Sequence, residues 1–419
     1  MRNILLSTVC LVPLLGQFYI TGEVAPMAMV RQSDGGIIQL PTRSISADIG
    51  WAFSELDLKS SVSLEHRWNS TTLEVDVREL YAIWYPEWGE IKVGKQILVW
   101  GGADGNNPTD NVNPYDYYFM FLPGTDRKMG TILASVTWVT DMFQLETVIS
   151  PKFQANRMPF NEPDFDFIPI EKPADELILT PDNEWEFGLR LGTIIGETDV
   201  TVSYFRGHDR TFVPSALLNP APDVMIPNFG YRRTQVYGAD AVGFLGELTY
   251  RIEGAYFDTR DEDWQIPSAA TYYQLVSQLE FTGVLDIQFT GQWIRSKILD
   301  VSGELLLLPP NQPPSLIPLT KDYFQPGMGT PFAMLADNGI MAGAKATLLD
   351  NALEIGLTTF YDLDEQGKML GLTTDYSPLE NWQMSLGITT LMGDENKPDY
   401  PFTALEDFSH YRLGLTYHF

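Results

Sequence analysis

Cysteine is almost absent from this chain of 419 residues: the single one, Cys10, lies close to the N-terminus. Residues 1–16 resemble a secretory signal, because an arginine at the start is followed by a mostly apolar stretch from Ile4 to Leu15. We expect this segment to be a signal peptide and residues 17–419 to form one domain. That domain has no cysteine, which excludes disulfides, thiol catalysis and cysteine-bound metals.

Basic residues are also scarce. The chain has 27 lysines and arginines against 55 aspartates and glutamates, which gives a formal net charge of −28. An acidic surface repels nucleic acids and anionic lipid headgroups, so neither is expected as a main partner.

Long hydrophobic runs are missing as well. After the N-terminal segment there is no run of about 18 or more apolar residues, which excludes a membrane protein built from helices. The mean hydropathy is −0.10. A closed β-barrel remains allowed, because its apolar residues occupy every second position and are diluted in any window.

Sequence motifs of the common enzyme classes are absent. The four histidines are scattered without an H-E-x-x-H pattern, and no nucleophile elbow, Walker loop or dinucleotide-binding glycine pattern occurs. We therefore expect neither enzymatic activity nor a cofactor. A surface enzyme or adhesin built on a plugged barrel is kept as an alternative.

The sequence is rich in alternation of apolar and polar residues. The last ten residues, HYRLGLTYHF, place Tyr411, Leu413, Leu415, Tyr417 and Phe419 on one face of a strand and polar residues or glycine on the other. Segments such as EWEFGLRLGT repeat this pattern, and helical periodicity is rare. Open sheet edges are not tolerated in a bilayer, so a membrane sheet of this kind must close on itself.

The connections between these segments alternate between tight turns and long loops. This pattern is typical of a barrel with short periplasmic turns and long external loops, and it gives about 18 strands, with 16 as the alternative. The fold expected is all-β: a closed antiparallel transmembrane β-barrel in the bacterial outer membrane, surrounded by lipid. Tryptophans and tyrosines near the strand ends agree with aromatic girdles at the membrane surfaces.

Residues 93–114, VGKQILVWGGADGNNPTDNVNP, carry a resemblance to a known group. They resemble the G-[RK]-Q-x-x-x-W-G…D…NP stretch of bacterial outer-membrane porin-like barrels, including the alginate-export-type barrels. The matching residues are Gly94, Lys95, Gln96, Trp100, Gly101, Asp104, Asp110, Asn113 and Pro114. In porins the third external loop folds into the lumen, so the resemblance implies a constriction containing Asp104, Asp110, Asn113 and Asp116. A loop that only caps the outer rim is the alternative.

The wall opposite this loop is expected to carry charges of both signs. The resemblance implies facing bases, and alternation along the strands adds lumen carboxylates. The bases are Arg78, Arg190, Arg251 and Lys345, and the carboxylates include Glu65, Glu74, Asp76, Glu184, Glu186, Glu253 and Glu280. The spacing of Asp104 and Asp110 offers oxygen ligands without the glycine and glutamate of an EF-hand, so metal binding stays open.

The hairpin around Glu87 contains a conflict between charge and alternation. Alternation in TLEVDVRELYAIWY assigns five residues to the lipid face: Leu73, Val75, Val77, Tyr81 and Ile83. Glu79 and Lys95 fall on the same face, where an unpaired lysine would cost roughly 2–4 kcal/mol at the midplane. We expect Glu79 and Lys95 to form an ion pair across the two strands, together with a local bulge.

Two external loops, residues 165–179 and 303–319, mix proline with aliphatic residues. The favoured interpretation is a lid whose loops pack on one another. The alternative is an apolar entry funnel for a hydrophobic substrate.

These observations predict an outer-membrane channel for passive diffusion of small solutes, with a cation preference set by an acidic lumen. A substrate-specific transporter for hydrophobic or aromatic compounds is the alternative. Phe419, with Tyr417 two residues earlier, resembles the C-terminal signal read by the barrel-assembly machinery. The sequence leaves the oligomeric state open, a homotrimer included.

Overall fold

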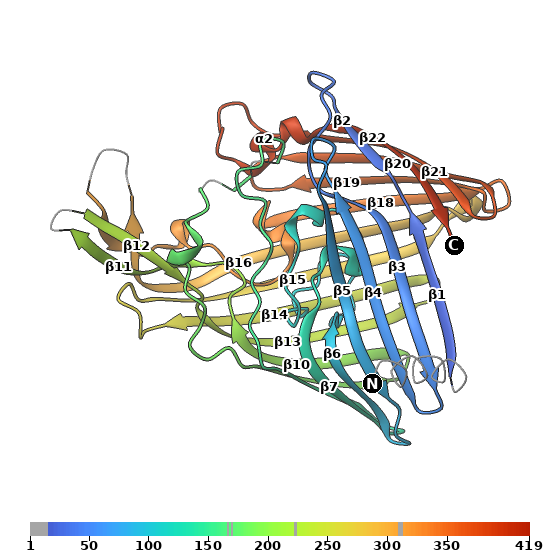
Figure 1. The fold of residues 1–419 in the computed structure, drawn as a ribbon, viewed down its shortest axis with the longest axis horizontal. Helices are drawn as coiled ribbons and strands as arrows, with labels where there is room; N and C mark the ends of the chain where they lie inside the picture. Colours follow the sequence, from blue (N-terminus) through green and yellow to red (C-terminus); the bar gives the residue numbers. More distant parts are fainter. Residues whose placement is uncertain (1–15, 166, 169–170, 222–223, 309–312) are drawn as a thin grey trace, which may run out of the picture.

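The computed structural model describes residues 16–165, 167–168, 171–221, 224–308 and 313–419. Strands dominate these residues (Figure 1), and none of their helices has the length and apolar character needed to span a bilayer. Apart from Gly16, the predicted signal peptide lies outside the described residues.

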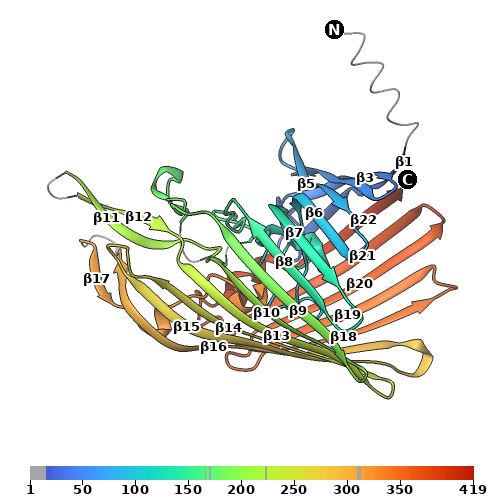
Figure 2. The same ribbon diagram turned by 90° about the horizontal axis from the view of Figure 1, so that it is seen from below.

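In the described residues, 18 antiparallel strands form a closed barrel wall, which confirms the predicted fold and the larger of the two strand counts. The first wall strand consists of β1 (Gln17–Val24) and β2 (Met27–Arg31), separated by Ala25 and Pro26. Both halves pair with the last strand, β22 (His410–His418). Gly22 and Phe419 exchange two backbone hydrogen bonds of 3.1 and 2.9 Å, and the C-terminus lies beside β1 in Figures 1 and 2.

The other wall strands follow one another around the barrel in chain order. They are β3 (Thr42–Phe53), β4 (Leu56–His66), β5 (Leu73–Trp84), β6 (Gly89–Gln96), β7 (Thr131–Val139), β8 (Gln144–Ser150), β9 (Glu186–Ile195), β10 (Thr198–His208), β13 (Arg233–Leu245), β14 (Leu248–Asp261), β15 (Ser268–Thr282), β16 (Gln288–Leu307), β18 (Asn338–Leu348), β19 (Leu353–Asp362), β20 (Lys368–Leu379) and β21 (Trp382–Met392). Each pairs with its sequence neighbours in the wall, as expected for an up-and-down barrel.

Tight turns gather at the periplasmic end and long loops at the external end. The turns after β9 and β13 have glycines, Gly196 and Gly246, with φ near +66° and +67°, a conformation that glycine adopts without strain. Five external loops matter below. They are L3 (97–130), L4 (151–185), L5 (209–232), L7 (308–337) and L9 (393–409).

Short elements lie within these connections. L5 carries the hairpin of β11 (Val213–Ala221) and β12 (Val224–Gly230), which projects beyond the wall (Figures 1 and 2), and L7 carries β17 (Ser315–Pro318). The helical turns are η2 (Tyr117–Phe119), η3 (Gly124–Arg127), η4 (Asp175–Leu177), η5 (Val284–Asp286), η6 (Lys321–Tyr323), η7 (Pro331–Met334), α2 (Pro401–Ala404) and η8 (Glu406–Phe408).

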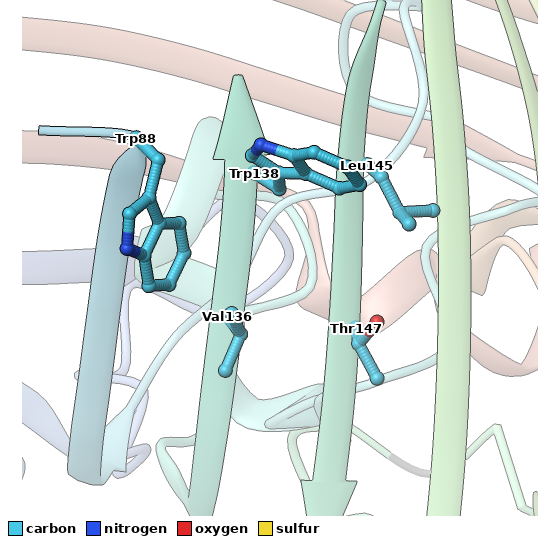
Figure 3. Close-up of a pocket in the computed structure, with 5 residues that line it drawn as sticks. All are labelled: Trp88, Val136, Trp138, Leu145 and Thr147. Carbon is cyan, nitrogen blue, oxygen red and sulfur yellow. The ribbon is translucent and has the colours of Figure 1, made fainter. Parts of the chain in front are cut away.

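The outer face of the wall is apolar. On β22, Tyr411, Leu413 and Leu415 are 41–52% exposed, whereas His410 on the other face is buried. Near the periplasmic end, Trp88 and Trp138 flank a shallow apolar hollow on this outer face (Figure 3). A continuous apolar exterior on a closed sheet is the surface that a lipid bilayer requires.

A bulge in β5 resolves the conflict between charge and alternation. The register with β4 shifts between Ser61 and Val62, which leaves Arg78 as an extra residue in β5. Beyond it the faces exchange: Val75 is 67% exposed before the bulge, whereas Ile83 is 1% exposed after it. The predicted bulge is present, and the assignments of Tyr81 and Ile83 to the lipid face are wrong, because Leu80 and Trp84 take that face instead.

The predicted ion pair of Glu79 and Lys95 does not form. In the register of β5 and β6, Lys95 lies opposite Leu80. Its ammonium donates to the Val77 carbonyl and lies 3.7 Å from Asp76. Glu79 accepts a 2.8 Å hydrogen bond from the Ile97 backbone, because the bulge has turned it toward the start of L3.

Candidate pore constriction

L3 leaves the wall at the end of β6 and turns into the barrel. Asn113, which is 1% exposed, connects the two ends of the loop. Its Oδ1 accepts a hydrogen bond from the Leu98 backbone N–H at 2.8 Å. Its Nδ2 donates to the carbonyls of Gln96 and Met129, at 2.9 and 3.0 Å. One amide therefore joins both branches of L3. The loop lies within the barrel, as the resemblance to porins predicts, and does not only cap its rim.

A single carboxylate from the opposite wall binds the tip of L3. Glu253 of β14 accepts hydrogen bonds from the backbones of Gly102 at 2.9 Å and Ala103 at 3.1 Å through Oε2. Its Oε1 accepts from the backbone and the hydroxyl of Thr109, at 2.9 and 2.8 Å. Glu253 is fully buried. Backbone N–H groups that converge in this way form an anion-binding nest, here filled by a side chain of the wall.

Glycine at position 101 makes this close approach feasible. Gly101 has φ +91°, and a Cβ there would lie 2.4 Å from Oε1 of Glu253. Any larger residue would have to adopt a strained backbone and displace the carboxylate. Gly101, one of the residues that carry the resemblance, therefore has a direct structural role in docking L3 on the wall.

Two glutamines of the wall extend this contact without adding charge. Gln278 and Gln292 lie opposite each other on β15 and β16. The Asp104 backbone donates to Gln278 at 2.9 Å, and Gln292 donates to the Asp104 carbonyl at 2.8 Å. Asn106 donates to Gln292 at 2.7 Å. Each amide supplies both a donor and an acceptor, so Asp104 and Asn106 in the strip of L3 from Ala103 to Thr109 form hydrogen bonds with the wall without an added charge.

Asp104 is the predicted constriction residue that remains open to the lumen. Its carboxylate is 67% exposed and lies 3.8 Å from the guanidinium of Arg251 on β14. Arg251 also donates to the Gly102 carbonyl at 2.8 Å and pairs with Glu280. The structure thus brings together Asp104 and one of the predicted wall bases.

Asp110 lies in a buried ion pair and does not face the open lumen. Its Oδ2 lies 2.8 Å from Nζ of Lys128, and both side chains are 3% exposed. Arg210 lies beside this pair and donates to the carbonyls of Asn111 and Val112, at 3.2 and 3.1 Å. Burial lowers the pKa of Lys128, and the neighbouring Asp110 carboxylate counteracts this effect.

Asp116 also lies in a buried charged group. It accepts a 3.0 Å hydrogen bond from Arg157 of L4, which also pairs with Glu65 of β4 at 2.8 Å. Arg43 of β3 lies 3.9 Å away. Burial raises the pKa of Asp116 to about 6, because it outweighs the attraction of the two guanidinium groups. Asp116 therefore fastens L3 to L4 and to the wall.

The remaining predicted wall residues lie in several places. Arg78 pairs with Asp126 of L3 at 3.0 Å. Glu186 is buried and pairs with Arg210 at 2.8 Å. Lys345 pairs with Glu354 at 2.8 Å on strands β18 and β19. Glu184 precedes β9 and is half-buried.

Glu74, Asp76 and Lys95 line a small pocket beside the bulge of β5. Arg190 lines a cavity at the periplasmic end. Among the described residues, no group of three side chains is arranged to hold a metal ion.

The strip of L3 lies between two cavities. The periplasmic one, of about 850 Å³, is lined by Gly101, Gly102 and the lower ends of β7 to β10, β13 and β14. The external one, of about 470 Å³, is lined by the second half of L3 and by L4, L5, L7 and L9. Both cavities have more acidic than basic side chains. The periplasmic cavity has Asp141, Glu146, Asp199 and Asp240 against Arg190 and Arg251, and the external one has Asp110, Asp322, Asp337 and Asp399 against Arg210 and Lys321.

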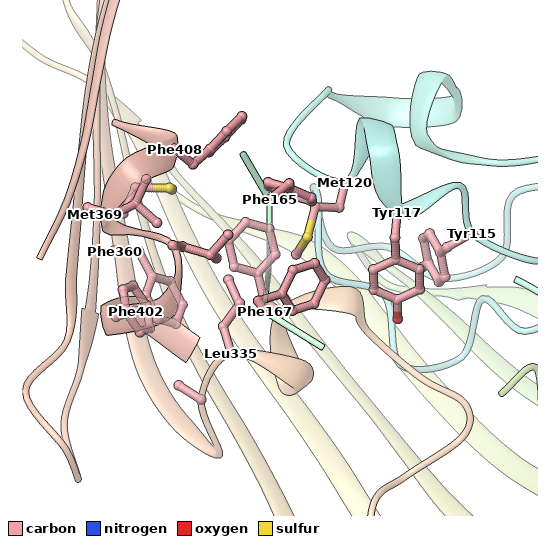
Figure 4. Packing of buried hydrophobic residues seen from close by; sticks show 14 of the residues in the cluster. Tyr115, Tyr117, Met120, Phe165, Phe167, Leu335, Phe360, Met369, Phe402 and Phe408 are labelled. Carbon is pink, nitrogen blue, oxygen red and sulfur yellow. The ribbon is translucent and has the colours of Figure 1, made fainter. Parts of the chain in front are cut away.

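A cluster of aromatic residues closes the external side. Phe165 and Phe167 of L4 pack with Phe408 of L9, Tyr117 of L3 and Leu335 of L7 (Figure 4). Phe165 and Phe167, at the start of the segment 165–179, therefore pack against other external loops, whereas Asp175, Glu176 and Leu179 are exposed; residues 166, 169 and 170 lie outside the described residues.

The other proline-rich segment, residues 303–319, forms the end of β16 and a hairpin with β17. Its residues Leu306 and Leu319 are buried. Residues 309–312 of this segment lie outside the description. Leu308 and Leu316 of the same segment are 52% and 41% exposed, so the lid interpretation stays a prediction for this segment.

Sequence reasoning missed the partners that hold L3 in place. Glu253 was assigned to the lumen by its alternation, but no sequence signal marked it as the acceptor for L3. Gln278, Gln292 and Lys128 were not singled out, because amides and one lysine are common in lumen walls and loops. The resemblance pointed to this region through residues of L3 itself, among them Gly101, Asp104 and Asn113.

Comparisons with known proteins agree on the fold. No model of a protein family and no curated protein sequence matches the chain. Among solved structures, OccAB4 of Acinetobacter baumannii has a TM-score of 0.52 at 10% identity, over 96% of this chain and 97% of that one.

The outer membrane protein OpdK of Pseudomonas aeruginosa has a TM-score of 0.51 at 11% identity, over 96% and 99% of the two chains. Wzi of Escherichia coli, a carbohydrate-binding β-barrel involved in capsule assembly, has a TM-score of 0.51 at 10% identity, over 98% and 86%. The chain has the fold of these outer-membrane, porin-like β-barrels.

Proposed function

We propose that the protein is an outer-membrane channel for the passive diffusion of small solutes, with a preference for cations. The observation that carries this proposal is a closed barrel in which L3 lies between two cavities whose exposed charges are mostly acidic: Asp141 and Asp199 in the periplasmic cavity, and Asp322, Asp337 and Asp399 in the external one. Carboxylates along a pathway lower the free energy of a cation there and raise that of an anion. The L3 strip restricts the passage, so we expect a small conductance.

Ion selectivity tests this proposal. In a planar bilayer separating two KCl concentrations, the reversal potential is expected to have the sign of potassium preference. Asp141→Asn combined with Asp199→Asn removes two carboxylates from the periplasmic cavity and should reduce the potassium preference, because the local field becomes less negative.

Asp350→Asn is the matched control for this experiment. Asp350 lies in the exposed turn after β18, outside both cavities, and its removal should leave the reversal potential unchanged. A reversal potential that indicates anion preference would refute the proposal.

We also infer that Phe419 acts as the recognition signal for outer-membrane assembly. Its ring is 47% exposed on the lipid-facing side, and its backbone already pairs with Gly22. Deletion of Phe419 should lower the amount of folded barrel in cells severalfold, while refolding in detergent micelles proceeds. Phe419→Tyr should retain assembly, because an aromatic terminus remains. Equal loss in cells and in micelles would instead indicate a purely structural role.

The sequence leaves the oligomeric state open, with a homotrimer as one candidate. Light scattering of the detergent-solubilised protein would give the mass of the assembly.

A further inference from the structure

Six aromatic rings and three methionines are part of the lining of the external cavity. Rings come from L3, L4, L5 and L7, and methionines from L4 and L7. They are Tyr115, Tyr117, Phe160, Phe167, Phe212, Phe324, Met158, Met328 and Met334. A volume of about 470 Å³ lies within the range of cavities that hold small organic ligands. The size and lining of the cavity suit the apolar body of such a molecule.

The buried charges of this cavity neutralise each other. Arg210 pairs with Glu186 at 2.8 Å, and Asp110 pairs with Lys128 at 2.8 Å. Neither Arg210 nor Asp110 therefore offers an uncompensated charge to a ligand. A carboxylate ligand would have to compete with Glu186 for the guanidinium.

The exposed charges of the cavity are predominantly negative. Asp322, Asp337 and Asp399 are exposed, and in the described residues none of them lies within 4.0 Å of a basic group in an ion pair. Lys321 is the single exposed basic residue in the described lining. The mouth of the cavity therefore favours a positively charged ligand.

The floor of the cavity is the part of L3 that follows the dividing strip. Asn111 is 3% exposed and accepts a hydrogen bond from the Gly329 backbone at 3.1 Å, which ties L3 to L7. Asp110 has one carboxylate oxygen, Oδ1, that is buried without a hydrogen-bond partner in the described residues. A ligand here lies directly above the strip that separates the two cavities.

We propose that the external cavity binds small organic cations with an aromatic body, with the rings of L3, L4 and L5 around the body and the carboxylates of L7 and L9 near the charge. Aromatic faces and nearby carboxylates both stabilise an organic ammonium group. This inference rests on the proposed channel, for which it names a class of ligand. A bound cation would obstruct the approach to L3 from the external side.

Calorimetric titration of the detergent-solubilised barrel tests the inference with three probes. Benzyltrimethylammonium has the body and the charge, tetramethylammonium has the charge alone, and benzoate has the body with the opposite charge. We expect benzyltrimethylammonium to bind about tenfold more tightly than either of the others. Benzoate binding as tightly as benzyltrimethylammonium would overturn the inference.

Variants locate the site. Asp337→Asn combined with Asp399→Asn should weaken binding of benzyltrimethylammonium severalfold, and so should Phe212→Ala. Glu395→Gln is the control, because Glu395 is an exposed acid of L9 outside this cavity. Heat-modified migration on gels confirms that each variant is folded. Unchanged affinity in the folded double variant and in folded Phe212→Ala would also overturn the inference.

The binding assay needs no ion current. Binding without any current would refute the channel and leave the site in place. A cation-selective current without binding would refute the site and leave the channel.

Discussion

A barrel carrying Glu253→Ala is expected to conduct several times more current than the parent, with frequent fluctuations. The substitution removes the acceptor for the backbones of Gly102, Ala103 and Thr109. A hydrogen bond to a charged group contributes about 1.5–3 kcal/mol, so the tip of L3 loses much of its attachment to β14. Single-channel recording in planar bilayers measures the effect. Glu253→Gln should be intermediate, because its amide retains one acceptor oxygen.

Asp199→Asn is the control for Glu253→Ala. Asp199 lines the periplasmic cavity below L3, and its replacement by asparagine removes one carboxylate, as Glu253→Ala does. Among the described residues it makes no hydrogen bond to L3, and the conductance should stay close to that of the parent. If Glu253→Ala and Asp199→Asn have the same conductance, the attachment of L3 to Glu253 does not control the passage.

Asp110→Asn is expected to lower the stability of the folded barrel by about 3–5 kcal/mol, the cost of leaving a buried charge without its partner. The substitution isolates the Lys128 ammonium, which is 3% exposed inside L3. Urea unfolding in detergent micelles, followed by tryptophan fluorescence, measures the loss. Because burial already lowers the pKa of Lys128, part of the loss should disappear at high pH, where the lysine becomes neutral.

The pair of Lys345 and Glu354 gives the matched comparison. Its atoms are also 2.8 Å apart, but its side chains are 49% and 41% exposed. Exposed pairs contribute about 0–1 kcal/mol, so Glu354→Gln should scarcely change the unfolding midpoint. Equal losses for Asp110→Asn and Glu354→Gln would show that L3 is solvated around Lys128.

Alternation was enough to predict the barrel, because every wall strand must present an apolar face to lipid. It failed at Arg78, where one extra residue exchanges the two faces of β5. Nothing in RELYAIW marks the bulge except the charge of Glu79 on the supposed lipid face. The same shift moved Lys95 opposite Leu80 and removed the expected ion pair.

The constriction was predictable only in part. The resemblance placed L3 in the lumen, and Asp104 does lie there beside Arg251. Asp110 and Asp116 have the same residue type and lie on the same loop, but both are buried in ion pairs, Asp110 with Lys128 of L3 itself and Asp116 with Arg157 of L4. The partners of Asp116 include Arg157, 41 residues later, and Arg43, much earlier in the chain, and pairings of this range leave no local pattern.

The seam between the first and last strands has a kinetic consequence. This seam joins residues 17–31 to residues 410–419. Nearly all of the other strands must therefore be in place before the barrel can close. Until then β1 and β22 have unpaired backbone groups, which attract other chains. Contacts between such distant residues also form slowly. Pro26 lacks a backbone N–H donor and interrupts the first strand at this seam. Before the barrel closes, this edge is therefore less able to pair with a strand of another chain.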